Sequence, residues 1–357
     1  MSAEPDSLID CDVHELIASA VELLPYVGPE WRPYLEYDPT ILRTKDFYVE
    51  PPGFEQEAVP ATSAERTDAI RGYLDGCGIR HAVLSTNNQA VSILPQSHYA
   101  AVVARAYNTW LAENVLAADE RLLGSITIAA QEPELAAAEI ARLGDDPRFV
   151  QVAVPITSPS QPWGHPSYDP IWRACVDHDL PVAMHLAPSA GLGGRPNFAG
   201  WPRTFVEWRS QNHSLFQSQL ISMVVRGTFE KFAELKVVMV EGGFAWVPSV
   251  LWRLDQSWRG VRFEAPWLRR PPSDYVRDNV RFTTNPFPAP DDLRDLNRVI
   301  EMLDSDEMLL FGSGYPRGGW DRAEAVSAAL DERLRAKVMW ENASTVYRLP
   351  TSIAAGR

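Results

Sequence analysis

Two side chains near the N-terminus are suited to hold a metal ion together. Asp12 and His14 lie two positions apart in a strand-like stretch that begins at Leu8, and residues two apart on a strand project from the same face. A carboxylate and an imidazole on one face are good ligands for a divalent cation such as zinc. Taken alone, an Asp-x-His pair is more often a buried, hydrogen-bonded pair than a metal site.

Two later apolar runs also end in residues whose side chains can ligate a metal ion. His185 closes Pro-Val-Ala-Met-His, and Glu241 closes Lys-Val-Val-Met-Val-Glu just before Gly242-Gly243, where the backbone can turn tightly and leave room for a ligand. A buried carboxylate needs a cation or hydrogen-bond donors, so Glu241 requires a metal, a substrate cation or an arginine such as Arg253. With the first pair, these residues predict one shared metal site.

The elements that must position these side chains alternate between strand and helix. Such alternation predicts βα units, a parallel sheet and, with eight pairs, a closed (β/α)8 TIM-type barrel whose site lies at the C-terminal ends of the strands. The predicted strands are 8–14, 81–85, 122–128, 149–154, 181–185, 236–241, 280–284 and 308–313, and the predicted helices are 63–76, 98–118, 132–143, 170–178, 214–233, 244–258, 291–303 and 322–334.

Two segments interrupt this alternation. Residues 15–61 are rich in Pro and aromatic residues and show no sustained period, and residues 187–212 begin with a Pro- and Gly-rich stretch. We interpret them as loop insertions after the first and fifth strands. Because barrels with insertions commonly fold as one unit, we expect a single domain over residues 1–357.

Composition excludes several kinds of partner. The net charge is -14, and binding to nucleic acid or anionic lipid needs clustered Lys and Arg. The N-terminus lacks the basic start and apolar run of a secretory signal, and no long uncharged apolar run occurs. Three widely spaced cysteines favour reduced thiols over a disulfide framework. We expect a cytoplasmic protein with a small-molecule partner, and neither nucleic acid nor membrane.

The last strand completes a set of motifs that resembles a known family. In order along nearly the whole chain, the motifs are Ile9-Asp10-Cys11-Asp12-Val13-His14, Met184-His185, Leu235 to Gly243, Phe311-Gly312-Ser313 with Tyr315-Pro316, and Glu341-Asn342-Ala343. The chain resembles the amidohydrolase-related (amidohydrolase 2) family, in the branch that contains aminocarboxymuconate-semialdehyde decarboxylase. The resemblance implies a barrel enzyme of the lyase or hydrolase type and a homodimer.

The resemblance also implies roles for particular residues. Asp12 and His14 would be the first-strand metal ligands and His185 the fifth-strand ligand, while Glu241 occupies a position where decarboxylases of this family often carry a catalytic histidine. The eighth strand departs from the family pattern Ser-Asp-Tyr-Pro-His, because this chain reads Ser-Gly-Tyr-Pro-Arg. Gly314 therefore replaces a carboxylate ligand. Arg317 replaces a histidine and is better suited to pair with an anion.

Three hypotheses follow from this departure. In the first, Asp12, His14 and His185 still hold a divalent metal, zinc by preference or else manganese, with Glu241 or water completing the shell, since about three protein ligands suffice. The enzyme would then decarboxylate, or otherwise cleave, a small carboxylated or aromatic metabolite, for example one of secondary metabolism. Hydrolysis is less favoured without the eighth-strand base. Glu241, His185 and Arg317 are the catalytic candidates; Asn285, Tyr315, Arg317 and His213 are the substrate-binding candidates.

The other two hypotheses need no metal. In one, Glu241, His185 and Asp12 act as acid and base groups in the same pocket, and Arg317 or Asn285 orients the substrate. In the other, the chain is a non-catalytic binding descendant of the fold. Because Gly314 replaces the expected carboxylate ligand, the alternative that the protein binds no metal cofactor stays open.

Overall fold

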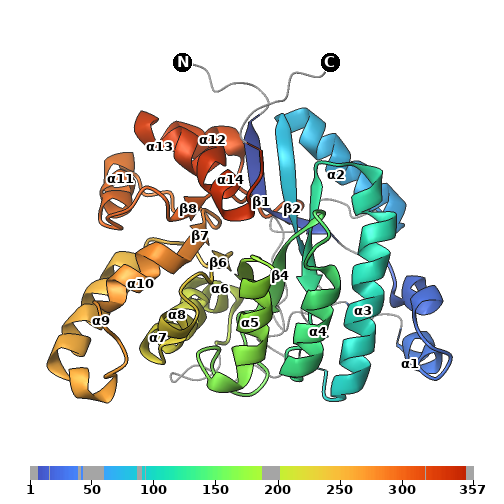
Figure 1. Cartoon of the computed structure of the whole chain (residues 1–357). Coiled ribbons are helices and arrows are strands. Elements are labelled where there is room, and N and C mark those ends of the chain that lie inside the picture. Colours follow the sequence, from blue (N-terminus) through green and yellow to red (C-terminus); the bar gives the residue numbers. More distant parts are fainter. Residues whose placement is uncertain are drawn as a thin grey trace.

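The barrel is built from eight parallel strands that neighbour one another in chain order. The computed structural model describes residues 7–15, 17–38, 42, 60–86, 91–92, 94–186, 202–317 and 319–350, and the strands of its sheet neighbour one another in the order β1 to β8 (Figure 1). The strands are β1 Leu8–Glu15, β2 Ile79–Thr86, β3 Leu122–Thr127, β4 Phe149–Pro155, β5 Val182–His185, β6 Val237–Val240, β7 Val280–Thr283 and β8 Leu309–Leu310. The predicted barrel class is confirmed.

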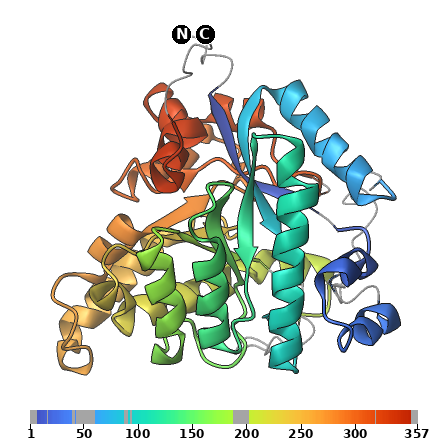
Figure 2. The ribbon, with the colours of Figure 1, turned by 45° about the vertical axis from the view of Figure 1, so that its right-hand side comes forward.

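Helices alternate with the strands and pack around the outside of the sheet (Figure 2). Those that begin near a predicted start are α2 Ser63–Cys77, α3 Ser97–Asn114, α4 Pro133–Leu143, α5 Asp169–Asp177, α7 His213–Val225, α9 Val247–Gly260, α11 Leu293–Glu301 and α12 Ala323–Ala329. Additional helices are α1 Arg32–Tyr37, α6 Phe205–Gln211, α8 Thr228–Lys231, α10 Pro272–Asn279, α13 Glu332–Ala336 and α14 Asn342–Tyr347, with 3-10 helical turns at Ala20–Tyr26, Leu116–Ala118, Pro166–Tyr168 and Arg262–Glu264 and a π-helical turn at Lys337–Glu341.

Two predicted helices are each divided in the structure. The stretch 214–233 forms α7 and α8, because Gly227 between them takes a left-handed backbone with φ of +77°, which ends a helix. The stretch 322–334 forms α12 and α13, separated by extended backbone at Leu330. The single long helices predicted for these stretches were therefore wrong.

The predicted insertions are partly described. The first contains the turn Ala20–Tyr26 and α1, and the second contains α6. Residues 16, 39–41, 43–59 and 187–201 of these predicted insertions lie outside the described residues.

The inside of the barrel is apolar at one end. Alternate strand residues form a small core separate from the one beneath the helices, and Ala343 and Tyr347 of α14 pack into it. The Tyr347 hydroxyl donates to Gln151 Oε1 at 3.0 Å, which joins α14 to β4. The strand residues of this core are Ile9, Cys11, Val83, Leu123, Val150, Ala183, Val238, Val240 and Leu310. The barrel is thus filled below its mouth.

Backbone hydrogen bonds close the barrel between its first and last strands. Cys11 N donates to the Phe311 carbonyl at 2.9 Å, and His14 N donates to the Tyr315 carbonyl at 2.7 Å. The segment after the short strand β8 therefore continues alongside β1, and a bridge pairs Val13 with Tyr315. This seam places the loop after β8 beside the candidate ligands Asp12 and His14.

Neither a membrane span nor a disulfide occurs in the part of the chain that the structure describes. None of the described helices combines the length and the apolar character that crossing a bilayer requires. Cys11, Cys77 and Cys175 are all free thiols.

Candidate metal centre

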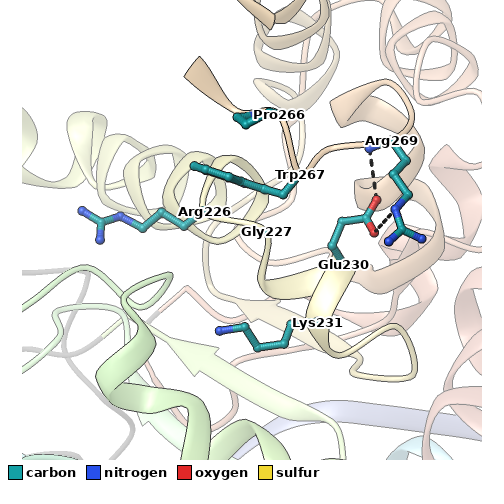
Figure 3. A pocket seen from close by; sticks show the side chains of 7 residues that line it. All are labelled: Arg226, Gly227, Glu230, Lys231, Pro266, Trp267 and Arg269. Atoms are coloured by element: carbon teal, nitrogen blue, oxygen red, sulfur yellow. Dashed lines mark hydrogen bonds and ion pairs between the residues drawn. The ribbon is translucent and has the colours of Figure 1, made fainter. Parts of the chain in front are cut away.

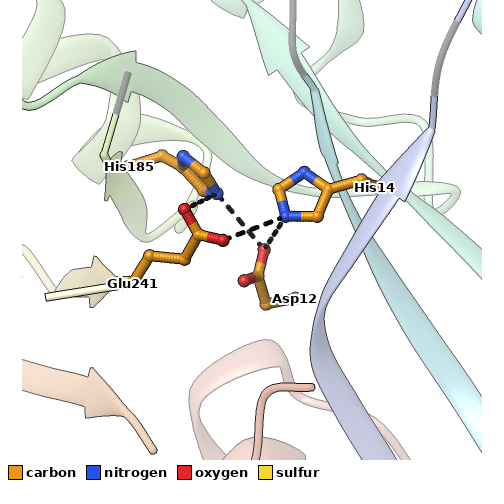
Figure 4. Close-up of side chains that lie close together, drawn as sticks. All are labelled: Asp12, His14, His185 and Glu241. Carbon is orange, nitrogen blue, oxygen red and sulfur yellow. Dashed lines mark ion pairs between the residues drawn. The ribbon is translucent and has the colours of Figure 1, made fainter. Parts of the chain in front are cut away.

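Four side chains from three strands converge at the mouth of the barrel (Figure 4). Asp12 and His14 come from β1, His185 ends β5, and Glu241 follows β6. Each offers one ligand atom, and these atoms all lie within 4.8 Å of one another. His14 Nε2 is 3.6 Å from Asp12 Oδ1 and 3.4 Å from Glu241 Oε1, and His185 Nε2 is 3.4 Å from Asp12 Oδ1 and 3.7 Å from Glu241 Oε2.

The donor atoms of this cluster are buried and incompletely satisfied. Asp12 is 0% exposed, and His14 and His185 are each 2% exposed. Asp12 Oδ1, His14 Nε2 and His185 Nε2 have no hydrogen-bond partner among the described residues. Buried polar atoms left unpaired are costly, and one divalent cation between them would satisfy all three. The residues present therefore fit a metal ion.

A backbone carbonyl orients the His185 ring. His185 Nδ1 lies 2.6 Å from the Leu186 carbonyl oxygen, and because a carbonyl only accepts, Nδ1 carries the proton. The lone pair is then on Nε2, which faces the two carboxylates. Protein metal sites commonly orient their histidines in this way.

Electrostatics keep both carboxylates ionised. Burial would raise the pKa of Asp12, but its interactions with His14 and His185 outweigh burial and hold that pKa well below its usual range. Burial also opposes ionisation of Glu241, yet Arg317 and His185 lower its pKa to about 2. Burial and Arg317 lower the pKa of His14. Despite burial, Glu241 and Asp12 raise the pKa of His185.

Two further predicted site residues contact this cluster directly. Asn285 Nδ2 donates to Asp12 Oδ2 at 2.6 Å, and Arg317 Nη1 donates to Glu241 Oε2 at 2.5 Å. Arg253, which the sequence offered as a partner for Glu241, is instead exposed on α9. That alternative was wrong in its choice of arginine, because the loop after β8 brings Arg317 to the carboxylate.

Gly314 faces the same cluster. A Cβ atom at this position would lie 3.2 Å from Asn285 Nδ2, 3.6 Å from Glu241 Oε1 and 4.0 Å from Asp12 Oδ2. Gly314 has a φ of +78°, and Glu241 has a φ of +60°, which is unfavourable for a residue other than glycine. The Glu241 carboxylate thus lies next to the space that a side chain at position 314 would enter.

The remaining predicted substrate-binding residues lie outside the four-residue cluster. The Tyr315 ring stacks on Tyr73 with centroids 4.0 Å apart and meets Trp320 edge-on. Tyr315 is only 9% exposed. His213 is exposed at the start of α7. The substrate-binding roles of both remain predictions.

Sequence reasoning missed one polar neighbour of the cluster. Ser85 lies near the end of β2, in register with His14, and its buried side chain helps to lower the pKa of Asp12. A serine carries no strong chemical signal by itself. Its place at the end of an apolar strand is the feature that identifies it.

A separate pocket lies away from this cluster (Figure 3). Its charged groups largely pair with protein: Glu230 Oε2 lies 3.7 Å from Arg269 Nε, and Lys231 Nζ lies 2.5 Å from Asp169 Oδ2. The lining residues are Arg226, Gly227, Glu230, Lys231, Pro266, Trp267 and Arg269. None of the predicted site residues lines it.

Comparisons with known proteins agree with this architecture. The chain is 26% identical over 316 residues to a gamma-resorcylate decarboxylase of Rhodococcus jostii strain RHA1, covering 84% of this chain and 92% of that protein. An amidohydrolase from Mycobacterium avium subsp. paratuberculosis K-10 superposes with a TM-score of 0.72 at 19% identity, covering 99% of this chain and 100% of that one.

A further solved structure contains a metal. Dihydroxybenzoic acid decarboxylase from Polaromonas sp. JS666, with bound manganese and the inhibitor 2-nitroresorcinol, has a TM-score of 0.67 at 22% identity, covering 96% of this chain and 97% of that one. The profile of the family described as Amidohydrolase matches residues 9–349. This match includes residues of all eight strands and all four converging side chains, and it confirms the predicted membership: the chain belongs to the amidohydrolase family.

Proposed function

We propose that this protein is a metal-dependent carbon-carbon lyase that removes the carboxylate from a small aromatic acid. The observation that carries the proposal is the convergence of Asp12, His14, His185 and Glu241 on one point, with buried donor atoms left unsatisfied. The relative named gamma-resorcylate decarboxylase supports the reaction type. The manganese in the Polaromonas structure supports a divalent cation.

The four converging residues would hold the metal, which supplies electron withdrawal from a substrate oxygen when it is bound. Arg317 lies beside the cluster with its side chain 23% exposed, so its guanidinium is placed to bind an incoming carboxylate. The ionised Glu241 can accept a proton from a substrate hydroxyl at Oε1 and return it to the ring carbon. That carbon loses carbon dioxide and gains the proton, and the oxygen that gave up the proton remains as the phenolate of the product.

The charges of the site favour a substrate with a single carboxylate. Asp12 and Glu241 are ionised, and Arg317 is cationic. Together with a divalent cation they leave one net positive charge. A monoanionic aromatic acid neutralises this charge, whereas a neutral ester or amide does not.

Zinc is the metal we first expect from two imidazoles and two carboxylates, and manganese is the alternative that the Polaromonas structure supports. Gly314 lacks the carboxylate that the family pattern carries at this position, so we expect decarboxylation to be favoured over hydrolysis.

The test combines metal analysis with turnover. Protein purified without chelator is assayed for zinc and manganese, and for release of carbon dioxide from gamma-resorcylate and related hydroxybenzoates. His14→Ala and His185→Ala should lose both metal and turnover. His178→Ala is the matched control, since His178 pairs with Asp145 at the surface. Wild-type protein that binds neither metal contradicts the proposal.

One observation favours a second candidate. Arg317 already neutralises Glu241, so the pocket can also serve as a metal-free acid and base site. Turnover that survives exhaustive chelation would support this candidate. Turnover that stops on chelation and returns with added cation would exclude it. A chain that binds these acids without turning them over would instead support a non-catalytic descendant.

The homodimer is also a proposal. Beyond the family resemblance, its support is two exposed aromatic side chains: Trp252 of α9 is 58% exposed, and Phe263 in the 3-10 helical turn Arg262–Glu264 is 77% exposed. Exposed aromatic residues are enriched at interfaces. Light scattering on the purified protein, compared with Trp252→Glu, tests it, and a monomeric wild-type protein would contradict it.

A further inference from the structure

Asp10 is a buried carboxylate outside the four-residue cluster. It is 0% exposed, and three donors surround it. Oδ1 accepts from the backbone N–H of Asp12 at 3.1 Å and from that of Ser313 at 2.9 Å, and Oδ2 accepts from the Tyr73 hydroxyl at 2.8 Å. These donors lie on β1, on the loop after β8 and on α2.

Next to Asp10, strand β1 contains one extra residue. In the pairing with β2, Asp10 lies opposite Ala82 and Val13 lies opposite Leu84. Cys11 and Asp12 therefore face the single residue Val83, which is the arrangement of a β-bulge. The extra residue changes the alternation of the strand. Cys11 packs into the inner core, while Asp12 still joins the cluster at the mouth.

The bulge also alters the seam with the last strand. Cys11 N donates to the Phe311 carbonyl, and in a regular parallel ladder the Cys11 carbonyl would then accept from Ser313 N. Ser313 N donates to Asp10 Oδ1 instead. One carboxylate oxygen thus accepts from two N–H groups, one on each side of the seam. Beyond it, backbone pairing resumes with Gly314 N donating to the Asp12 carbonyl at 2.9 Å.

From these contacts we infer that Asp10 is a positioning residue for the metal centre. Its carboxylate stabilises the bulge that places Asp12 in the cluster, and it ties β1 to the loop that carries Arg317. Without it, two buried N–H groups would lose their acceptor, which is costly. The bulge would then relax toward regular pairing and displace Asp12. This inference rests on the proposed metal site.

The decisive comparison is between Asp10→Ala and Asp10→Asn. Asparagine keeps an oxygen that can accept from both N–H groups, and its amide can donate to the Tyr73 oxygen. The measurement is the affinity for Mn²⁺ or Zn²⁺, by competition with a chromophoric chelator, together with thermal unfolding of the metal-free protein. Asp10→Ala should bind the cation roughly 10- to 100-fold more weakly, and Asp10→Asn should stay within about threefold of wild type.

A matched control separates positioning from general stability. Asp255 in the helical layer accepts from Ser273 N at 2.9 Å and from Ser273 Oγ at 2.8 Å. Asp255→Ala should therefore lower the unfolding temperature without weakening cation binding. Tyr73→Phe removes only the hydroxyl that donates to Oδ2, so it should also keep wild-type cation affinity.

The cation affinities of the variants and of the wild type test separately the role of Asp10 and the proposed metal-dependent function. A folded Asp10→Ala protein with wild-type cation affinity overturns the role of Asp10, even if its unfolding temperature falls. If that variant does not fold, Asp10→Ser takes its place under the same criterion. A wild-type protein that binds no cation contradicts the proposed function itself. Weak binding in Asp10→Ala together with recovery in Asp10→Asn supports the inference.

Discussion

Arg317 and Glu241 form an ion pair at the mouth of the barrel, with Arg317 Nη1 2.5 Å from Glu241 Oε2. The pair joins the loop after β8 to the residue after β6, and the Glu241 side chain is only 11% exposed. Removing one member of such a pair leaves the other charge poorly compensated. Because a guanidinium carries five N–H donors, Arg317 has the capacity to hold Glu241 and a substrate carboxylate together.

Replacing Arg317 should weaken substrate binding more than metal binding. Arg317→Gln removes the charge that we assign to the substrate carboxylate, so KM for gamma-resorcylate should rise roughly tenfold or more, while metal content stays near that of wild type. Steady-state kinetics and metal analysis measure the two effects. Arg322→Gln is the control, since Arg322 lies over the Trp320 ring on the same loop. An unchanged KM in Arg317→Gln would contradict this role.

Adding a carboxylate at position 314 should make the thermal stability of the protein depend more strongly on a bound cation. In Gly314→Asp the new side chain enters beside Glu241 and Asp12, so repulsion lowers the unfolding temperature of the metal-free protein. Added Mn²⁺ should then raise it by more than it does for wild type. Gly319→Asp is the matched control, because Gly319 has a similar φ of +73° and a Cβ added there would meet nothing within 4 Å among the described residues. Equal metal-induced shifts in both variants would refute the prediction.

Chelation should destabilise the wild-type protein. Without a cation, two ionised carboxylates and several unsatisfied atoms remain buried at the mouth. A cation present at about 100 times its Kd stabilises the folded state by about 2.7 kcal/mol, which corresponds to a shift of several degrees in unfolding temperature. Differential scanning fluorimetry with and without chelator measures the shift. The effect should disappear in His14→Ala, and its persistence there would place the metal elsewhere.

Acid should remove the stabilisation provided by Asp119, which links α2 to the start of β3. Hydrogen bonds from Arg121 and Arg71 lower the pKa of Asp119 from 3.8 to about 2. A carboxylate with a depressed folded pKa contributes stability above its unfolded pKa and loses it as the pH falls through the folded one. Asp119→Asn should therefore cost roughly 1 to 2 kcal/mol at pH 7 and almost nothing near pH 2.

Urea denaturation of the wild type and of Asp119→Asn at pH 7, pH 4 and pH 2 measures the difference in their free energies of unfolding. Asp68→Asn is a suitable control, because Asp68 also pairs with Arg71 but its side chain is 71% exposed. A cost for Asp119→Asn that stays constant from pH 7 to pH 2 would show that the interaction is not electrostatic.

The sequence by itself determined the barrel and the residues at its mouth. Parallel strands have a period of two and end at one rim, so Asp12, His14, His185 and Glu241 could be placed together from their positions at strand ends. The apolar runs before them also predicted which strands are buried. These features depend on the order of neighbouring residues along the chain, so they can be predicted from the sequence.

Only the tertiary structure decided how distant segments meet. It paired Glu241 with Arg317 rather than with Arg253, and it placed the Tyr315 ring against Tyr73. It also placed the Asp10 carboxylate where it accepts from the N–H groups of Asp12 and Ser313. Apart from the bond between Asp12 and Asp10 within β1, these contacts join different strands, loops or helices, where the partner of a side chain depends on backbone direction and packing. No periodicity in the sequence encodes that choice.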